Sequence, residues 1–159
     1  MADENNERNF LQLHRLMLDA TRVLRAKFDS FVPLGKPLKA WLPSEKDMKK
    51  AKLTEKQIKH IKQHPNSGEF DISLLVSLMR HFCYTKDLRH PLWEETDNNK
   101  IVPSLTGEIA DIVRIRNLRN EVCIIFIIIH VVGCTCKNSV TMHVNLFETV
   151  LSATHYQYC

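Results

Sequence analysis

The sequence contains few of the residues that make tight turns, with 4 glycines and 6 prolines among 159 residues. Because sandwiches and barrels depend on such turns, this scarcity argues against a turn-rich all-β fold. The sequence also lacks a glycine-rich phosphate loop, a G-x-S-x-G elbow and an H-E-x-x-H pair. Nucleotide hydrolases, esterases and metalloproteases built on those motifs therefore have no support.

Charged side chains are almost absent from the last part of the chain. Residues 122–159 hold Lys137 and Glu148, whereas the preceding residues hold all the other Lys, Arg, Asp and Glu. The overall composition, with 44% hydrophobic and 25% charged residues, is that of an ordinary globular protein. A net charge of +4 is too small to indicate nucleic-acid binding by itself. The chain thus divides near Glu121 into a charged part and an apolar tail.

The five cysteines are odd in number, and four of them lie in the tail. The N-terminal residues are polar and acidic and do not have the pattern of a signal peptide. These features favour a reducing, cytoplasmic setting. Cysteines and histidines occur near one another in and before the tail: Cys123, His130, Cys134, Cys136 and His143. Their spacing fits poorly with the C-x₂₋₄-C pairs of structural zinc sites. We therefore predict no metal and no cofactor.

Apolar residues recur every three or four positions in four segments, which predicts helices over about 9–31, 55–64, 72–82 and 106–122. Thr54 and Gln57 form a capping-box pattern, and Asp71 and Thr106 are suitable N-caps. The segment 84–106 contains Trp93 and is predicted to be a long loop whose tryptophan covers the core. Between residues 46 and 62 the chain carries seven lysines and two acids. This pattern favours a solvated helix face over a phosphate-binding surface.

The apolar tail begins with eleven residues, 122–132, of which one is polar. Leaving them in water would cost more than about 10 kcal/mol, so the run must be covered by the core, a partner chain or lipid. Eleven residues are fewer than the roughly 20 that a membrane-spanning helix requires. The run suits either a buried strand or a helix, and a final short helix is expected over about 138–153.

Three stretches, RLMLDATRVLR at 15–25, FDISLLVSLMR at 70–80 and ADIVRIRNLRNEV at 110–122, lie in a familiar order. Together they resemble the HEPN domain of the type named after the DAZ-interacting zinc-finger ubiquitin ligase. The resemblance covers about residues 9–122 and leaves 123–159 as a divergent, cysteine-containing tail. It implies an all-α helical bundle, which agrees with the periodicity of the predicted helices.

The resemblance also implies a chemistry, because active HEPN proteins are dimeric, metal-independent ribonucleases. Their signature is an Arg, often followed by Asn, then a His after four to six residues on a late helix. Arg119 and Asn120 match its beginning, but the positions for His hold Ile124, Ile125 and Phe126. Isoleucine cannot transfer a proton, and general acid–base catalysis contributes about 10² to 10⁴ in rate. We therefore predict no catalytic residue.

The leading hypothesis is a non-catalytic helical interaction module that binds proteins or a second copy of itself, in a signalling, innate-immune or RNA-surveillance context. Two alternatives stay open: a metal-independent HEPN ribonuclease, and a protein anchored to a membrane by residues 122–136. Contact with RNA or another phosphate is a candidate role for the late helix, although the spacing favours ion pairing of its arginines with Asp111 and Glu121. The candidate contact residues are Arg114, Arg116, Arg119 and Asn120.

Overall fold

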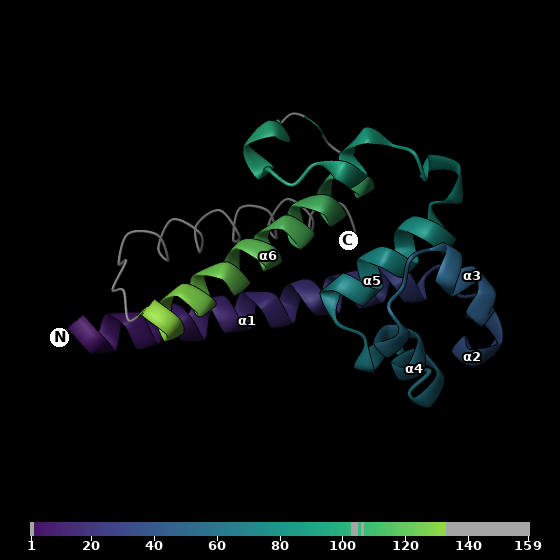
Figure 1. The fold of residues 1–159 in the computed structure, drawn as a ribbon, viewed down its shortest axis with the longest axis horizontal. Coiled ribbons are helices and arrows are strands. Elements are labelled where there is room, and N and C mark those ends of the chain that lie inside the picture. The colour runs from purple at the N-terminus through teal and green to yellow at the C-terminus, as the bar shows by residue number, and fades with distance from the viewer. Residues whose placement is uncertain (1, 103–104, 106, 133–159) are drawn as a thin grey trace. The chain divides into compact units, whose positions relative to one another are not determined.

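The computed structural model describes residues 2–102, 105 and 107–132. Within these residues the fold is all-α and contains no strand, which confirms the predicted fold class (Figure 1). The helices are α1 (Ala2–Asp29), α2 (Leu38–Trp41), α3 (Glu45–Lys50), α4 (Glu55–Gln63), α5 (Ile72–Leu78) and α6 (Glu108–Val132).

Two helix N-termini are capped by the residues that the sequence indicates. The Thr54 hydroxyl accepts a hydrogen bond from the Gln57 backbone N–H at 3.3 Å, and Gln57 Oε1 accepts the Thr54 N–H at 2.9 Å. This reciprocal pair is the predicted capping box of α4. Asp71 caps α5 by accepting the Leu74 N–H at 2.8 Å. The third predicted cap, Thr106, lies outside the described residues.

Several boundaries differ from the sequence prediction. Helix α1 begins at Ala2, and two short helices, α2 and α3, lie where the sequence suggested a loop and an undivided lysine-rich stretch. Helices of four to six residues are too short to show a clear apolar period, which explains why they were missed. Helix α5 ends at Leu78 and continues as a π-helical turn, Met79–Cys83. The predicted loop 84–106 contains 3₁₀ turns at 85–87, 91–94 and 98–100.

The described residues form two compact units, and each is considered by itself. The second unit, residues 21–93, has an aromatic centre formed by Phe28, Trp41 and Phe70. The Phe28 ring packs edge to face with Trp41 at a centroid distance of 5.5 Å and with Phe70 at 6.1 Å. Such pairs stabilise a core beyond their buried area. They join the end of α1 to α2 and to the residue preceding the α5 cap.

Trp93 completes the core of the second unit, as the sequence predicts. Its side chain is fully buried, and its indole N–H donates a hydrogen bond of 2.9 Å to the Asp87 carbonyl oxygen. The Arg80 guanidinium lies over the Trp93 ring, 5.9 Å from its centroid. The polar edge of the indole is therefore satisfied inside the protein, and Trp93 is a core residue.

The first unit contains residues 2–20 and 94–132 among those described. Here α1 packs against α6, since Leu13 and Val122 share one buried cluster with Leu16 and Met17 beside it (Figure 1). Helix α6 runs to Val132 without interruption. The question of strand or helix for 122–132 is thus answered as helix, and the predicted domain boundary at 122/123 falls inside α6. The final helix expected over 138–153 lies outside the described residues.

Candidate functional site

Helix α6 presents all four residues that the sequence analysis assigned to phosphate or RNA contact. Its buried positions hold Ala110, Val113, Ile115 and Leu118, which fix the orientation of the helix in the first unit. Two polar residues of α6, Asp111 and Asn117, are also buried. The structure shows different surroundings for each of the four.

Arg114 is held by groups of the protein itself. Its Nη1 atom forms an ion pair with Asp111 Oδ1 at 2.9 Å, and its Nη2 atom donates to the carbonyl oxygens of Val102 and Leu105, each at 3.0 Å. The Arg114 side chain is 12% exposed. Burial raises the pKa of Asp111, although the neighbouring Arg114 acts in the opposite direction. Arg114 therefore connects α6 to the segment that precedes it.

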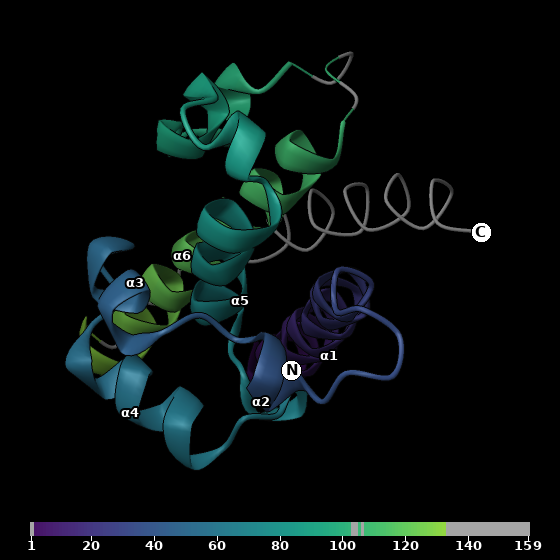
Figure 2. The same ribbon diagram turned by 90° about the vertical axis from the view of Figure 1, so that its right-hand side faces the viewer.

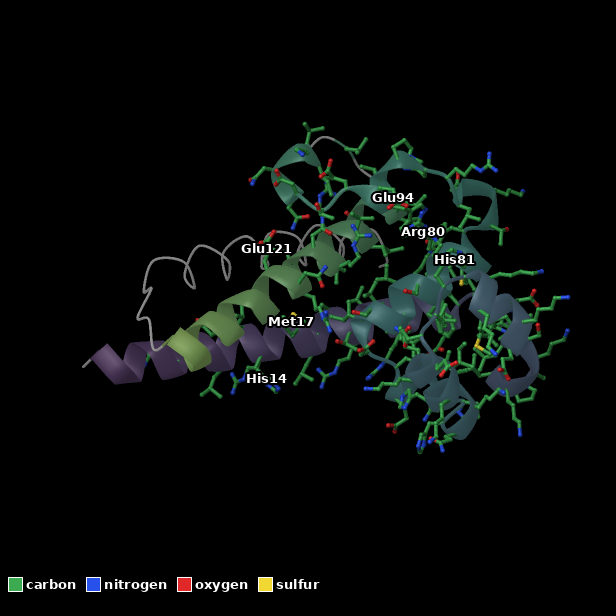
Figure 3. All side chains as sticks on the ribbon, viewed as in Figure 1. His14, Met17, Arg80, His81, Glu94 and Glu121 are labelled. Carbon is green, nitrogen blue, oxygen red and sulfur yellow. The ribbon has the colours of Figure 1, made fainter. Side chains whose placement is uncertain are left out.

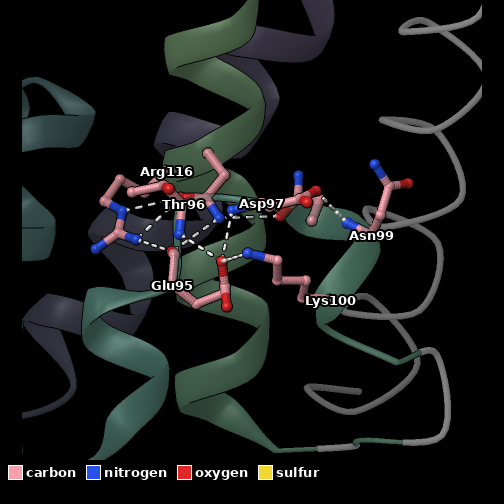
Figure 4. A network of polar contacts seen from close by, with 8 residues as sticks. Glu95, Thr96, Asp97, Asn99, Lys100 and Arg116 are labelled. Atoms are coloured by element: carbon pink, nitrogen blue, oxygen red, sulfur yellow. Dashed lines mark hydrogen bonds and ion pairs between the residues drawn. The ribbon is translucent and has the colours of Figure 1, made fainter.

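Arg116 and Asn117 form a second internal connection, to the segment around Glu95 (Figure 4). The Arg116 Nη2 atom donates to the Glu95 carbonyl oxygen, and its Nε atom donates to Asn117 Oδ1 at 3.1 Å. Asn117 Nδ2 donates to the same Glu95 carbonyl at 3.1 Å and to Asn98 Oδ1 at 3.3 Å. The two side chains thus share one backbone acceptor more than twenty residues away.

The segment held in this way is also ordered by its own side chains. Glu95 Oε1 accepts the Asp97 backbone N–H at 2.9 Å and lies 3.9 Å from the Lys100 Nζ atom (Figure 4). Asp97 Oδ1 accepts the Asn99 N–H at 2.9 Å. In turns outside regular helices, acidic side chains typically accept hydrogen bonds from nearby backbone N–H groups in this way.

Arg119 and Asn120 differ from the two preceding arginines. Asn120 is exposed, Arg119 is half-buried, and the Arg119 Nη1 atom donates to Asn120 Oδ1 at 3.1 Å. This contact joins neighbouring residues and connects α6 to no other element. Arg119 and Asn120 are consequently the candidate residues whose polar groups lie at the surface of α6. The assignment of phosphate contact remains a prediction for all four residues.

The sequence analysis missed Asn117, which is 2% exposed. A signal for it was present, because Asn117 interrupts the apolar pattern of α6 between Val113 and Leu118. A polar residue at such a position must be hydrogen-bonded inside the protein. Its partners could not be read from the sequence, since Glu95 and Asn98 lie in a segment without periodicity.

Two other histidines, His14 and His81, lie in different helical segments of the chain. His14 lies exposed on α1, and His81 follows Arg80 in the π-helical turn (Figure 3). Burial lowers the pKa of His81, and Arg80 adds to the effect. Among the described residues, no group of three or more His, Cys, Asp or Glu side chains is placed to hold a metal ion. Cys134, Cys136 and His143 of the zinc arrangement considered above lie outside them.

A helix that crosses a membrane must be both long and apolar. In the part of the chain that the structure describes, no helix meets both requirements. The anchor hypothesis concerned residues 122–136, of which 133–136 lie outside the described part.

A comparison with family models matches residues 34–126 to the DZIP3/hRUL138-like HEPN family. The match covers more than half of the chain and extends from the residues before α2 through Arg119 and Asn120 in α6. It begins later than the resemblance recognised in the sequence, which included α1. Comparisons with the curated proteins and with the solved structures gave no match.

Proposed function

The chain belongs to the DZIP3/hRUL138-like HEPN family, and on this basis we propose that it is a non-catalytic interaction module that binds proteins or a second copy of itself. We place it in the cytoplasm, in a signalling, innate-immune or RNA-surveillance context. We expect it to bind no resident cofactor.

The observation that carries the proposal is the Arg119–Asn120 pair on α6 without a histidine four to six residues further along the chain. The helix continues through positions 124–126, which hold Ile124, Ile125 and Phe126. His130 is eleven residues beyond Arg119, or about 16 Å along a helix with a rise of 1.5 Å per residue. The sequence therefore has the Arg-Asn beginning of the signature and lacks a proton-transfer group at the positions where active HEPN ribonucleases have their histidine.

A protein-binding role is supported by two leucines on α1. Leu11 is 50% exposed and Leu18 is 47% exposed. They are seven positions apart, so they lie on the same face of the helix, about two turns from each other. Leu13, on a different face, is buried against α6. Helix α1 thus has an inward apolar side and two outward leucines, which is the pattern of a helix that can pack against a partner helix.

The absence of catalysis can be tested with a fluorescent single-stranded RNA in buffer containing EDTA. We expect the wild-type protein and the Arg119→Ala variant to leave the RNA equally intact over hours. Cleavage by the wild-type protein that disappears in Arg119→Ala would overturn the proposal in favour of the ribonuclease alternative. EDTA chelates metal ions and thereby inactivates contaminating metal-dependent nucleases.

Self-association can be tested by sedimentation equilibrium over a range of protein concentrations. We expect the wild-type chain to dimerise and the double variant Leu11→Gln/Leu18→Gln to dissociate at concentrations where the wild type remains dimeric. Gln12→Ala and His14→Ala, which change exposed residues between the two leucines, serve as the control. A wild-type chain that stays monomeric, or a double variant that dimerises as well as the control, would contradict this mode of self-binding.

A further inference from the structure

The segment between α1 and α3, residues 31–43, is apolar in sequence and lies at the surface of the second unit. None of its thirteen residues is buried, and α2, which lies within it, contributes no residue to the core. Figure 2 shows the chain leaving the end of α1 as an open loop that returns to α2. Ten of the residues are apolar, and the other three are Gly35, Lys36 and Lys39. We call this segment the apolar loop.

Leu34 is the most exposed residue of this loop. Its exposed fraction is 103%, whereas the other exposed large hydrophobic residues in the described part of the chain are between 40% and 52% exposed. A single exposed leucine is common on protein surfaces, but a continuous apolar stretch marks a surface that another molecule covers. The neighbours of Leu34 in sequence are also apolar, and the half-buried Trp41 and Leu42 lie further along the same loop.

A tight turn places Leu34 at the tip of the loop. The Lys36 N–H donates a hydrogen bond of 3.1 Å to the Pro33 carbonyl oxygen, which closes a four-residue turn. Gly35 has a φ of 78°, the value that a type II turn requires at its third residue and that glycine adopts without strain. Leu34 is the second residue of this turn, so its side chain has a fixed position at a corner of the backbone.

Aromatic contacts hold both ends of the apolar loop to the rest of the second unit. At its beginning, the Phe31 ring packs edge to face with Tyr84 at a centroid distance of 5.3 Å. Near its end, the Trp41 ring packs in the same way with Phe28 at 5.5 Å. Between these contacts, prolines at positions 33 and 37 restrict the backbone. Because the loop is already ordered, a partner that binds it pays little conformational entropy.

The backbone of the apolar loop has few hydrogen-bond donors that need water. The three prolines, at positions 33, 37 and 43, have no N–H group. Five further N–H groups, those of residues 31, 32, 36, 40 and 42, donate to carbonyl oxygens within the chain. Covering a backbone donor costs free energy when that donor has no partner. An apolar surface can therefore cover most of this loop at a small cost in lost hydration.

The charges of the apolar loop are of one sign. Lys36 and Lys39 are exposed, and the loop contains neither Asp nor Glu. Neither lysine forms an ion pair with a residue in the described part of the chain. Two copies of the loop placed face to face would bring like charges together, which disfavours a symmetric contact between copies of this chain. The complementary surface carries negative charge.

We propose that the apolar loop docks into an apolar groove of a partner protein whose rim carries Asp or Glu side chains, with Leu34 inserted in the groove. Protein interfaces combine an apolar centre, in which aromatic residues are enriched, with a polar rim, and Trp41 and the two lysines fit these positions. A fluid bilayer gains nothing from the fixed shape of the turn, whereas a protein groove does. The inference rests on the proposed protein-binding role and gives it a second surface, separate from the leucines of α1.

A phage-displayed library of random peptides tests the proposal. The library is first depleted on the Leu34→Ser variant and then selected on the wild-type full chain, and the selected peptides are titrated by fluorescence anisotropy. We expect peptides that combine aromatic or aliphatic residues with Asp or Glu, and binding about 10-fold or more weaker to Leu34→Ser. The variant Lys36→Glu/Lys39→Glu should weaken binding about fivefold or more. Replacing the acidic residues of the peptide with lysine should restore binding to that variant.

Matched controls change exposed residues outside the loop: Val102→Ser for the leucine, and Lys86→Glu/Arg89→Glu for the two lysines. These variants should bind the peptides as tightly as the wild type does, and thermal unfolding should show that every variant folds. The proposal is overturned if no peptide is selected, if the selected peptides lack acidic residues, or if the controls lose binding as much as the loop variants do.

Two further measurements distinguish the other occupants of the loop. Phosphatidylserine vesicles that bind the wild-type chain and not Leu34→Ser, without any selected peptide, would overturn the proposal in favour of a lipid surface. Sedimentation in which Leu34→Ser abolishes self-association would overturn it in favour of a second copy. Either outcome leaves the tests of the proposed function standing, because those tests change Leu11, Leu18 and Arg119.

Discussion

Replacing Asn117 with alanine should destabilise the fold more than its size suggests. The side chain is 2% exposed and lies where α6 meets the segment around Glu95. It donates two hydrogen bonds, to the Glu95 carbonyl and to Asn98, and it accepts bonds from Arg116 at 2.9 and 3.1 Å. Alanine removes all of these hydrogen bonds at once and leaves the polar groups of Glu95, Asn98 and Arg116 with fewer partners.

The magnitude follows from the hydrogen bonds and their surroundings. A net hydrogen bond contributes about 1 kcal/mol, and a buried polar group left without a partner costs about 1 to 3 kcal/mol. The Glu95 carbonyl keeps its bond from Arg116, so the groups that lose most are Asn98 Oδ1 and the Arg116 guanidinium. We expect Asn117→Ala to lower the free energy of unfolding by about 2 to 4 kcal/mol.

Asn120→Ala provides a matched control, since it changes the same residue type on the same helix three positions away. Asn120 is exposed, and alanine has a higher helix propensity than asparagine, so its effect should lie within about 0.5 kcal/mol of zero. Urea unfolding followed by circular dichroism gives both free energies. Amide hydrogen exchange should show faster exchange at residues 95–100 in Asn117→Ala and unchanged exchange there in Asn120→Ala.

The reasoning would be refuted if the two variants differed by less than about 0.5 kcal/mol, or if residues 95–100 exchanged at the same rate in both. Either result would mean that the buried network has no role in holding this segment to α6.

Three further predictions concern single positions. Lys52→Gly should raise the free energy of unfolding by about 0.5 to 1 kcal/mol, measured by urea titration, because glycine adopts the left-handed conformation without strain; an unchanged or lower value would contradict this account of the turn. Burial raises the pKa of Cys83 from 9.0 to about 12, so alkylation of Cys83 at pH 8 should be far slower in the native protein than in urea, as followed by mass spectrometry; equal rates would refute it. Because burial raises the pKa of Asp111 above its ordinary 3.8, the folded state binds its proton more readily than the unfolded state, and stability should fall as pH rises from 3.8 through the raised pKa. Asp111→Asn should remove that part of the pH dependence, and identical pH profiles for the two proteins would disprove the assignment.

The features that the sequence predicted correctly are mostly local. The Thr54–Gln57 capping box and the Asp71 cap depend on residues three positions apart, so the pattern contains all the partners. The two missed helices, α2 and α3, are too short to display a period. At the candidate site, the pairing of Asp111 with Arg114 was an available alternative because the two are one helical turn apart. The roles of Arg116 and Asn117 required the position of the Glu95 carbonyl, which no periodicity indicates.

The cations of this protein divide according to the chemistry of their side chains. Arg114 and Arg116 each contact backbone carbonyl oxygens from the segment before α6, which uses the several donors and fixed geometry of a guanidinium. The lysines of α3 and α4 lie at the surface, and four of them form no ion pair with a described residue. A net charge summed over the whole sequence mixes these two groups. The total therefore does not distinguish cations that hold the fold together from cations that lie at the surface, and only the hydrogen-bond partners of each side chain separate the two groups.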